Sequence, residues 1–102
     1  MREDQVCAYL KGRCTGKHRA IKAARLGQSL RIGEKELQKV VAKLRRKGVP
    51  IASGPTGYYY AATAGEVYAT IRQLKEMEKG LQSSILGLES TLERFGERGD
   101  TP

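Results

Sequence analysis

The sequence predicts a mainly α-helical chain with a small β-hairpin, followed by a long C-terminal helix. Apolar residues recur at helical spacing over residues 4–47, alternate around a Gly-Pro-Thr-Gly turn at 54–57, and return to helical spacing over 63–95. The 102 residues are enough for one modest core. We therefore expect a folded domain over residues 1–62, an amphipathic helix over 63–96 and a disordered tail over 97–102.

Two short helices are expected before residue 31, with a brief strand at Ala20-Ile21 between them. The first spans about residues 4–12 and ends at Gly12 and Cys14-Thr15-Gly16. Its apolar side is formed by Val6, Tyr9 and Leu10. The inner stripe of the second is formed by Ala23, Leu26, Gly27 and Leu30.

A third, stronger helix is expected over Glu34–Lys47, directly after Arg31-Ile32-Gly33. It ends at Gly48 and Pro50, residues that typically stop a helix. Its apolar positions are Leu37, Val40, Val41 and Leu44. Two short helices joined by three residues form a helix-turn-helix pattern.

After Pro50 the apolar period changes from helical to alternating, which predicts a hairpin. Its turn is Gly54-Pro55-Thr56-Gly57, and strand-forming tyrosines follow it. Since side chains alternate along a strand, we expect Tyr58 and Tyr60 to point inward and Tyr59 outward.

The last third begins with a capping box, in which Thr63 accepts a hydrogen bond from the Glu66 amide. Apolar residues then recur at alternating spacings of four and three up to residue 95. The series is interrupted at Glu78, where the neighbouring Met77 is a possible substitute. Such a register predicts a dimerisation seam of two coiled helices. The alternative is a helix that breaks at Gly80 and packs back on the N-terminal domain. The expected seam residues are Val67, Ile71, Leu74, Leu81, Ile85, Leu88, Leu92 and Phe95.

Charge is divided unevenly along the chain. Residues 1–50 contain 14 Lys and Arg against 4 Asp and Glu, whereas residues 51–102 contain 5 against 7. A basic half of this kind is typical of a protein that binds a polyanion. The face of the third helix opposite its apolar stripe holds Lys35, Lys39, Ala42 and Arg46, and it is flanked by Gln38 and Lys43. All six are candidate DNA contacts.

The order helix, short strand, helix, turn, helix, hairpin over residues 4–62 resembles a winged helix-turn-helix domain. The resemblance rests on AARLGQSLRIGEKELQKVVAKLRRKGVPIASGPTGYYYA, above all on LRRKGVPI leading into GYYY. It is closest in kind to small bacterial and phage regulators, such as the N-terminal domain of the biotin repressor. The resemblance implies that helix 34–47 enters the major groove and that the hairpin, or wing, follows the backbone.

Two positions depart from that family pattern. Arg31 occupies a turn position that often holds glycine, and the hairpin tip contains no Lys or Arg. A wing contact would therefore depend on Thr56, Tyr59 and backbone amides. Additional backbone contacts, or simple surface cations, are expected at Lys22, Arg25, Arg31 and Arg45.

Other classes of protein are not favoured. Cys7, Cys14 and His18 do not have the spacing of a closed zinc site, so we predict no metal and no cofactor. No nucleophile motif or Gly-rich phosphate loop supports an enzyme. With no signal peptide and no membrane-length apolar run, we expect a cytoplasmic protein with reduced cysteines.

The sequence thus favours a homodimeric, sequence-specific binder of double-stranded DNA, acting as a small bacterial or phage transcription regulator. Two alternatives remain open. One is a winged-helix adaptor that contacts a protein partner in a larger complex. The other is an architectural protein of replication, recombination or packaging that binds DNA with little sequence preference.

Overall fold

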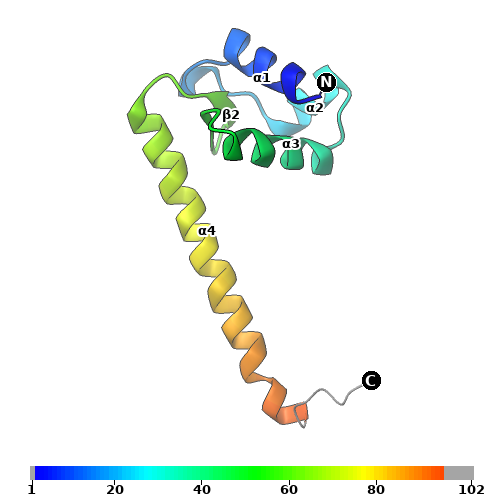
Figure 1. Cartoon of the computed structure of the whole chain (residues 1–102), viewed down its shortest axis with the longest axis vertical. Helices are drawn as coiled ribbons and strands as arrows, with labels where there is room; N and C mark the ends of the chain where they lie inside the picture. The colour runs from blue at the N-terminus through cyan, green and yellow to red at the C-terminus, as the bar shows by residue number, and fades with distance from the viewer. Residues whose placement is uncertain (1, 96–102) are drawn as a thin grey trace. The chain divides into compact units, whose positions relative to one another are not determined.

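The computed structural model describes residues 2–95 and confirms a mainly helical fold with a two-stranded antiparallel hairpin and a long C-terminal helix (Figure 1). The predicted tail at 97–102 lies outside the described residues. The chain divides into two compact units, residues 1–70 and 71–102, so the boundary falls inside the last helix rather than at residue 62. The elements are α1 (Arg2–Arg13), the 3-10 turn η1 (Lys17–Arg19), α2 (Ala23–Leu30), α3 (Glu34–Arg46), β1 (Ile51–Gly54), β2 (Gly57–Tyr60), α4 (Ala64–Ser90) and the 3-10 turn η2 (Leu92–Phe95).

The core of the first unit lies where α1, α2, α3 and the hairpin meet. Leu10, Leu26 and Leu37 come from three different helices and are completely buried. The four predicted apolar positions of α3 are all buried, which confirms the period read from the sequence. Burying each large aliphatic side chain contributes about 1.5–3 kcal/mol, so this shared core fixes α3 against its neighbours.

The turn between α2 and α3 is tight and holds a non-glycine residue in the left-handed region. Arg31 has φ 57° and ψ 47°, the conformation expected of a residue that closes a helix. The Ile32 amide donates to the Gly27 carbonyl at 2.9 Å. A Cβ on Gly27 would lie only 2.6 Å from the Ile32 oxygen, so this approach requires glycine.

The hairpin has the predicted two-residue turn, Pro55-Thr56, with Gly54 paired to Gly57. Gly57 has φ 122°, and a Cβ there would collide with the Ile21 carbonyl. Ile21 and Tyr58 exchange two backbone hydrogen bonds of 2.9 and 2.8 Å. The brief strand expected at Ala20-Ile21 is therefore confirmed as a single bridge to β2.

The predicted orientation of the tyrosines is wrong. Tyr59 is 2% exposed, whereas Tyr58 and Tyr60 are only half-buried. The strand alternates as expected, but the face that carries Tyr59 is covered by the first turns of α4, where Thr70 is also buried. Burial raises the pKa of the Tyr59 phenol, and the nearby Glu66 carboxylate raises it further.

The predicted cap of α4 is confirmed with a wider set of partners. The Glu66 amide donates to Thr63 Oγ1 at 3.2 Å. The Glu66 carboxylate accepts from the Ala62 amide at 2.7 Å and from the Lys17 amide at 2.9 Å. Thr70 Oγ1 accepts from the Ser53 amide and donates to the Glu66 carbonyl, both at 3.2 Å. The first two turns of α4 therefore belong to the first unit.

Beyond Thr70, α4 runs through Gly80 without the break considered as an alternative, and it ends at Ser90 rather than at residue 95. Ser90 Oγ and Thr91 Oγ1 each bond a backbone carbonyl of the preceding turn, at 2.7 Å, which favours a helix end. Leu92 and Phe95 consequently lie in η2. Among the described residues, no helix combines the length and apolar character needed to cross a lipid bilayer.

Candidate nucleic-acid interface

The outer face of α3 presents a row of exposed cations. None of the ion pairs within residues 2–95 involves Lys35, Lys39 or Arg46. All three side chains are exposed, as are Gln38 and Ala42. At 100° per residue they lie opposite the buried stripe of α3, so the core holds them in a fixed line on the surface. This group is called the α3 face below.

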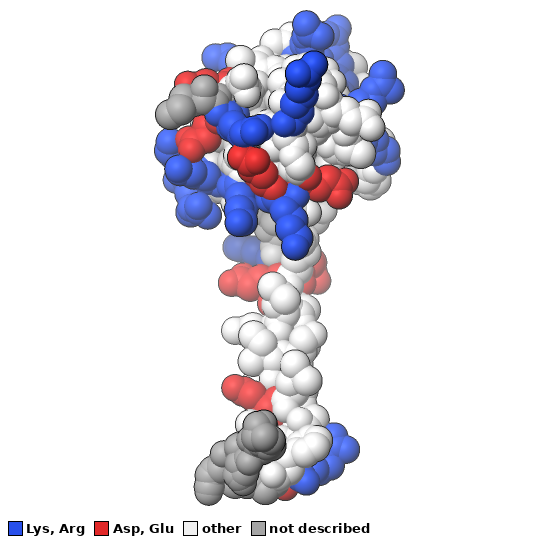
Figure 2. Space-filling model, turned by 90° about the vertical axis from the view of Figure 1, so that its right-hand side faces the viewer, with Lys and Arg blue, Asp and Glu red and all other residues white. Residues whose placement is uncertain are grey.

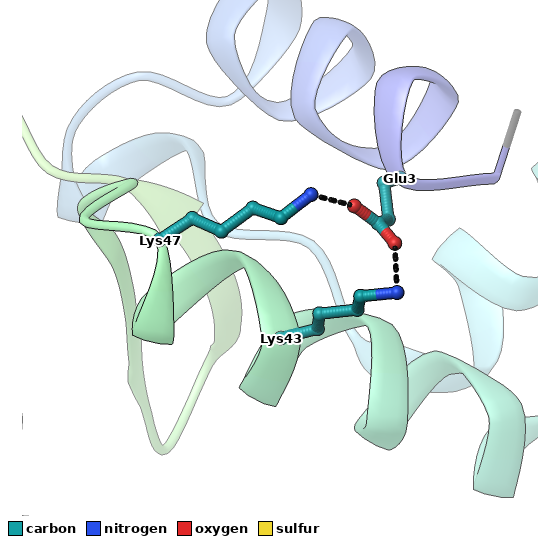
Figure 3. A network of polar contacts seen from close by, with 3 residues as sticks. All are labelled: Glu3, Lys43 and Lys47. Atoms are coloured by element: carbon teal, nitrogen blue, oxygen red, sulfur yellow. Dashed lines mark hydrogen bonds and ion pairs between the residues drawn. The ribbon is translucent and has the colours of Figure 1, made fainter.

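Lys43, which the sequence places on the flank of this face, is exposed but forms an ion pair. Its Nζ lies 2.9 Å from Glu3 Oε2, while Lys47 Nζ lies 2.7 Å from Glu3 Oε1 (Figure 3). Hydrogen bonds from Lys47 and Lys43 lower the pKa of the Glu3 carboxyl. Lys43 therefore lies on the flank of α3 that is turned toward α1, with its charge balanced by an acid from α1.

A second ionic contact joins the same two helices. Arg2 Nε lies 3.0 Å from Glu36 Oε2, and Arg2 Nη1 donates to the Arg31 carbonyl at 3.2 Å. Arg2, Glu3 and Lys47 were not recognised from the sequence as part of the site. Acids in the first turn of a helix are visible in the sequence, but only the packing of α1 on α3 shows what they contact.

The Arg45 side chain is hydrogen-bonded to β1, whereas the sequence led us to expect an exposed cation or a phosphate contact. Its Nε donates to the Ile51 carbonyl at 2.8 Å, and Nη2 donates to Ser53 Oγ at 3.1 Å. The side chain is half-buried, and burial lowers the pKa of the guanidinium. Arg45 thus fixes β1 to the end of α3.

Of the other residues expected to contact the DNA backbone, Lys22 and Thr56 lie close together. Lys22 Nζ donates to the Pro55 carbonyl at 3.1 Å, which places this cation at the hairpin tip beside the exposed Thr56. Arg25 and Arg31 are exposed. Tyr59 is removed from the interface because it is buried.

The second unit carries exposed apolar side chains in addition to its charged ones. Ile71, Leu81 and Leu88 are 41%, 66% and 70% exposed, and Figure 2 shows a largely uncharged surface over much of this unit. The predicted seam residues Leu74, Ile85, Leu92 and Phe95 are exposed as well. Val67 differs, because it is half-buried in the part of α4 that belongs to the first unit. A groove in this face is lined by Ile71, Leu74, Lys75, Met77, Glu78 and Leu81.

The first unit thus presents a basic helix face, and the second unit presents an apolar helix face. No protein family, curated protein or solved structure compared with the chain matches it.

Proposed function

We propose that this protein binds double-stranded DNA through the α3 face. The observation that carries the proposal is the row of Lys35, Lys39 and Arg46, which are exposed and not engaged by a carboxylate in residues 2–95. Their charges are available to phosphate groups without breaking an internal ion pair. Release of condensed counterions from DNA makes such contacts favourable at moderate salt.

The shape and composition of α3 support a contact in the major groove. A helix about 10–12 Å across fits a groove about 12 Å wide. Lys and Arg side chains bind guanine edges or phosphate, and Gln38 suits an adenine edge. The small side chain of Ala42, between the cations, allows close approach to the bases.

We propose further that residues 1–62 act as a winged helix-turn-helix domain, with α3 as its recognition helix. The tight turn at Arg31 and the hairpin beside α3 support this proposal. The hairpin tip contributes Thr56, its backbone amides and the neighbouring Lys22. Because the tip itself has no cation, its share of the binding energy is small.

The exposed apolar face of α4 supports self-association into a homodimer. Two copies double the number of base contacts, as in small helix-turn-helix regulators. The proposed role is a sequence-specific transcription regulator in the cytoplasm of a bacterial or phage-infected cell.

The test is DNA affinity at several salt concentrations, measured by fluorescence anisotropy on a labelled mixed-sequence duplex. Lys39→Ala with Arg46→Ala should weaken binding and reduce the slope of log affinity against log salt by about 2. The matched control is Arg72→Ala with Lys79→Ala, which removes the same charge from the second unit and should change neither quantity. An unchanged slope for the α3 variant would rule out this face.

Competitor DNA distinguishes the kinds of binder. Sequence-specific binding resists an excess of random duplex after an operator has been enriched from a random library. Equal competition by all sequences would indicate an architectural protein instead. Failure of the unaltered chain to bind any duplex at low salt would indicate an adaptor that contacts protein.

A further inference from the structure

A second group of cations lies in the first unit, away from the α3 face. Between Asp4 and Glu34 the chain contains seven Lys and Arg and no Asp or Glu. Those at the end of α1 and in the loop that follows are exposed. We name this group the second basic surface; it consists of Lys11, Arg13, Lys17 and Arg19.

The backbone that carries these cations is held in place from several directions. The Gly16 amide donates to the Tyr60 carbonyl, and the Tyr60 amide donates to the Cys14 carbonyl, both at 2.8 Å. The Lys17 amide donates to the Glu66 carboxylate at 2.9 Å. Gly16 has φ 95°, which sets the turn into η1. The loop therefore presents its side chains from a fixed backbone, at little ordering cost on binding.

The cations of this surface form no ion pairs within the described residues. None of the ion pairs of residues 2–95 involves Lys11, Arg13, Lys17 or Arg19. The carboxylate of Glu66 is the nearby negative charge, and it accepts hydrogen bonds from the Ala62 and Lys17 amides rather than from a cationic side chain. The guanidinium of Arg13 lies 5.2 Å from the centre of the Tyr9 ring, which orients it without neutralising it.

The acids of this half of the chain lie elsewhere. Glu3, Asp4, Glu34 and Glu36 occupy the first turns of α1 and α3. Arg13 is ten residues beyond Glu3 on α1, roughly 15 Å along the helix. Figure 2 shows acidic and basic side chains intermingled on one face of this unit.

The second basic surface is also separate from the hairpin tip. Thr15 and Gly16 pair with Tyr60, at the end of β2 farther from the Pro55-Thr56 turn. Lys22 contacts the tip itself. The two groups of cations are thus carried by different segments of this unit, helix α3 and the loop that follows α1 (Figure 1).

We propose that the second basic surface binds the phosphodiester backbone of a second nucleic-acid segment, so that one N-terminal unit holds two segments. Spaced cations on a turn whose backbone is fixed suit an extended polyanion, and arginine binds phosphate oxygens through paired hydrogen bonds. The identity of the partner rests on the proposed function, whereas the location of the surface does not.

The experiment uses the full chain with three triple variants, each of which removes three positive charges. The surface variant is Arg13→Ala, Lys17→Ala and Arg19→Ala. The α3 variant is Lys35→Ala, Lys39→Ala and Arg46→Ala. The matched control is Arg72→Ala, Lys79→Ala and Arg94→Ala in the second unit. All of these side chains are exposed, and circular dichroism with thermal melting verifies that each variant folds.

Two quantities are measured for each variant. The first is the slope of log affinity against log salt for a labelled duplex, obtained from protein titrations at several salt concentrations. The second is bridging, in which a duplex on beads captures a second, labelled nucleic acid through the protein. Bridging is measured with Leu81→Glu and Leu88→Glu added to every variant, because the two α3 faces of a dimer would also bridge. A labelled duplex and a labelled single strand are used in parallel, which shows the form of the second segment.

The surface variant should lose roughly tenfold or more in capture at moderate salt, while the control keeps it. Bridging by the surface variant equal to that of the control, for both nucleic acids, would overturn the proposal and leave the α3 assignment intact. Normal binding by the α3 variant, with loss of binding in the surface variant, would overturn the α3 assignment and the two-segment proposal together, because the second basic surface would then be the single binding site that the test reveals. No binding by the unaltered chain would overturn both.

Discussion

Lys43 Nζ on α3 lies 2.9 Å from the Glu3 carboxylate on α1 (Figure 3). A cation of the proposed recognition helix is thus already paired with an acidic side chain of the same protein. The other oxygen of Glu3 holds Lys47 at 2.7 Å. An approaching phosphate must compete with Glu3 for both ammonium groups. The contact therefore has two effects: it holds α1 against α3, and it reduces the positive charge that α3 offers to DNA.

Glu3→Gln should strengthen binding to a mixed-sequence duplex and steepen its salt dependence by about 1 to 2, because Lys43 and Lys47 become available to phosphate. The measurement is anisotropy over a range of salt concentrations. Asp4→Asn is the matched control, since it removes the same charge from a neighbour that makes no ion pair within residues 2–95. Equal behaviour of the two variants would show that only net charge matters.

Glu66 should make the first unit sensitive to acid. Hydrogen bonds from the Ala62 amide, then the Lys17 amide, lower the pKa of this carboxyl below its ordinary value of 4.5. Because the folded pKa is the lower one, the stabilisation is present above pH 4.5 and is lost as pH falls through the folded pKa. The free energy of unfolding, from urea titrations between neutral and acid pH, should fall less steeply in Glu66→Gln.

The control for that experiment is Glu76→Gln, which alters an exposed carboxylate in the second unit. It should leave the acid dependence of unfolding as in the unaltered chain. A Glu66→Gln profile that parallels the unaltered one would contradict the assigned role of this carboxylate.

Gly57→Ala should destabilise the hairpin by about 2 kcal/mol or more, because φ is 122° and the new Cβ meets the Ile21 carbonyl. Chemical denaturation followed by circular dichroism measures the loss. Gly54→Ala is the control at the paired position, where a Cβ meets nothing within 4 Å and φ is not in the left-handed region. Similar losses in both variants would disprove the role given to the Ile21 bridge.

Leu81→Glu with Leu88→Glu should convert the proposed dimer to a monomer, since both exposed side chains lie on the predicted seam. Light scattering after gel filtration gives the molar mass. Gln73→Glu with Ser83→Glu adds the same charge away from the seam and should preserve the dimer. A monomeric mass for the unaltered chain at every concentration would rule out self-association through α4.

Dimerisation through α4 can also be tested by shortening the chain, provided that Thr70 and its contacts are kept. Because Thr70 bonds β1 and Glu66 bonds the loop after α1, a chain that ends near Ala64 would lose contacts of the first unit. Ending the chain after Thr70 removes the exposed part of α4 while those contacts remain. Loss of the dimer in this shorter chain supports the α4 seam.

Local patterns in the sequence are sufficient to predict most of the secondary structure. The apolar stripe of α3, the Pro55-Thr56 turn and the Thr63–Glu66 cap each depend on residues within a few positions of one another. Backbone geometry and short-range hydrogen bonds decide such features, so spacing alone predicts them. The end of α4 was less predictable, because Ser90 and Thr91 compete for the carbonyls of the last turn.

The sequence by itself determined the helical and hairpin elements and the basic outer face of α3. Only the tertiary structure decided that Tyr59 is buried, that Arg45 holds β1 and that Glu3 neutralises Lys43. The physical reason is that burial and ion pairing depend on which distant segment covers a side chain. The period of a strand or helix defines its two faces, but the packing of other elements determines what each face meets.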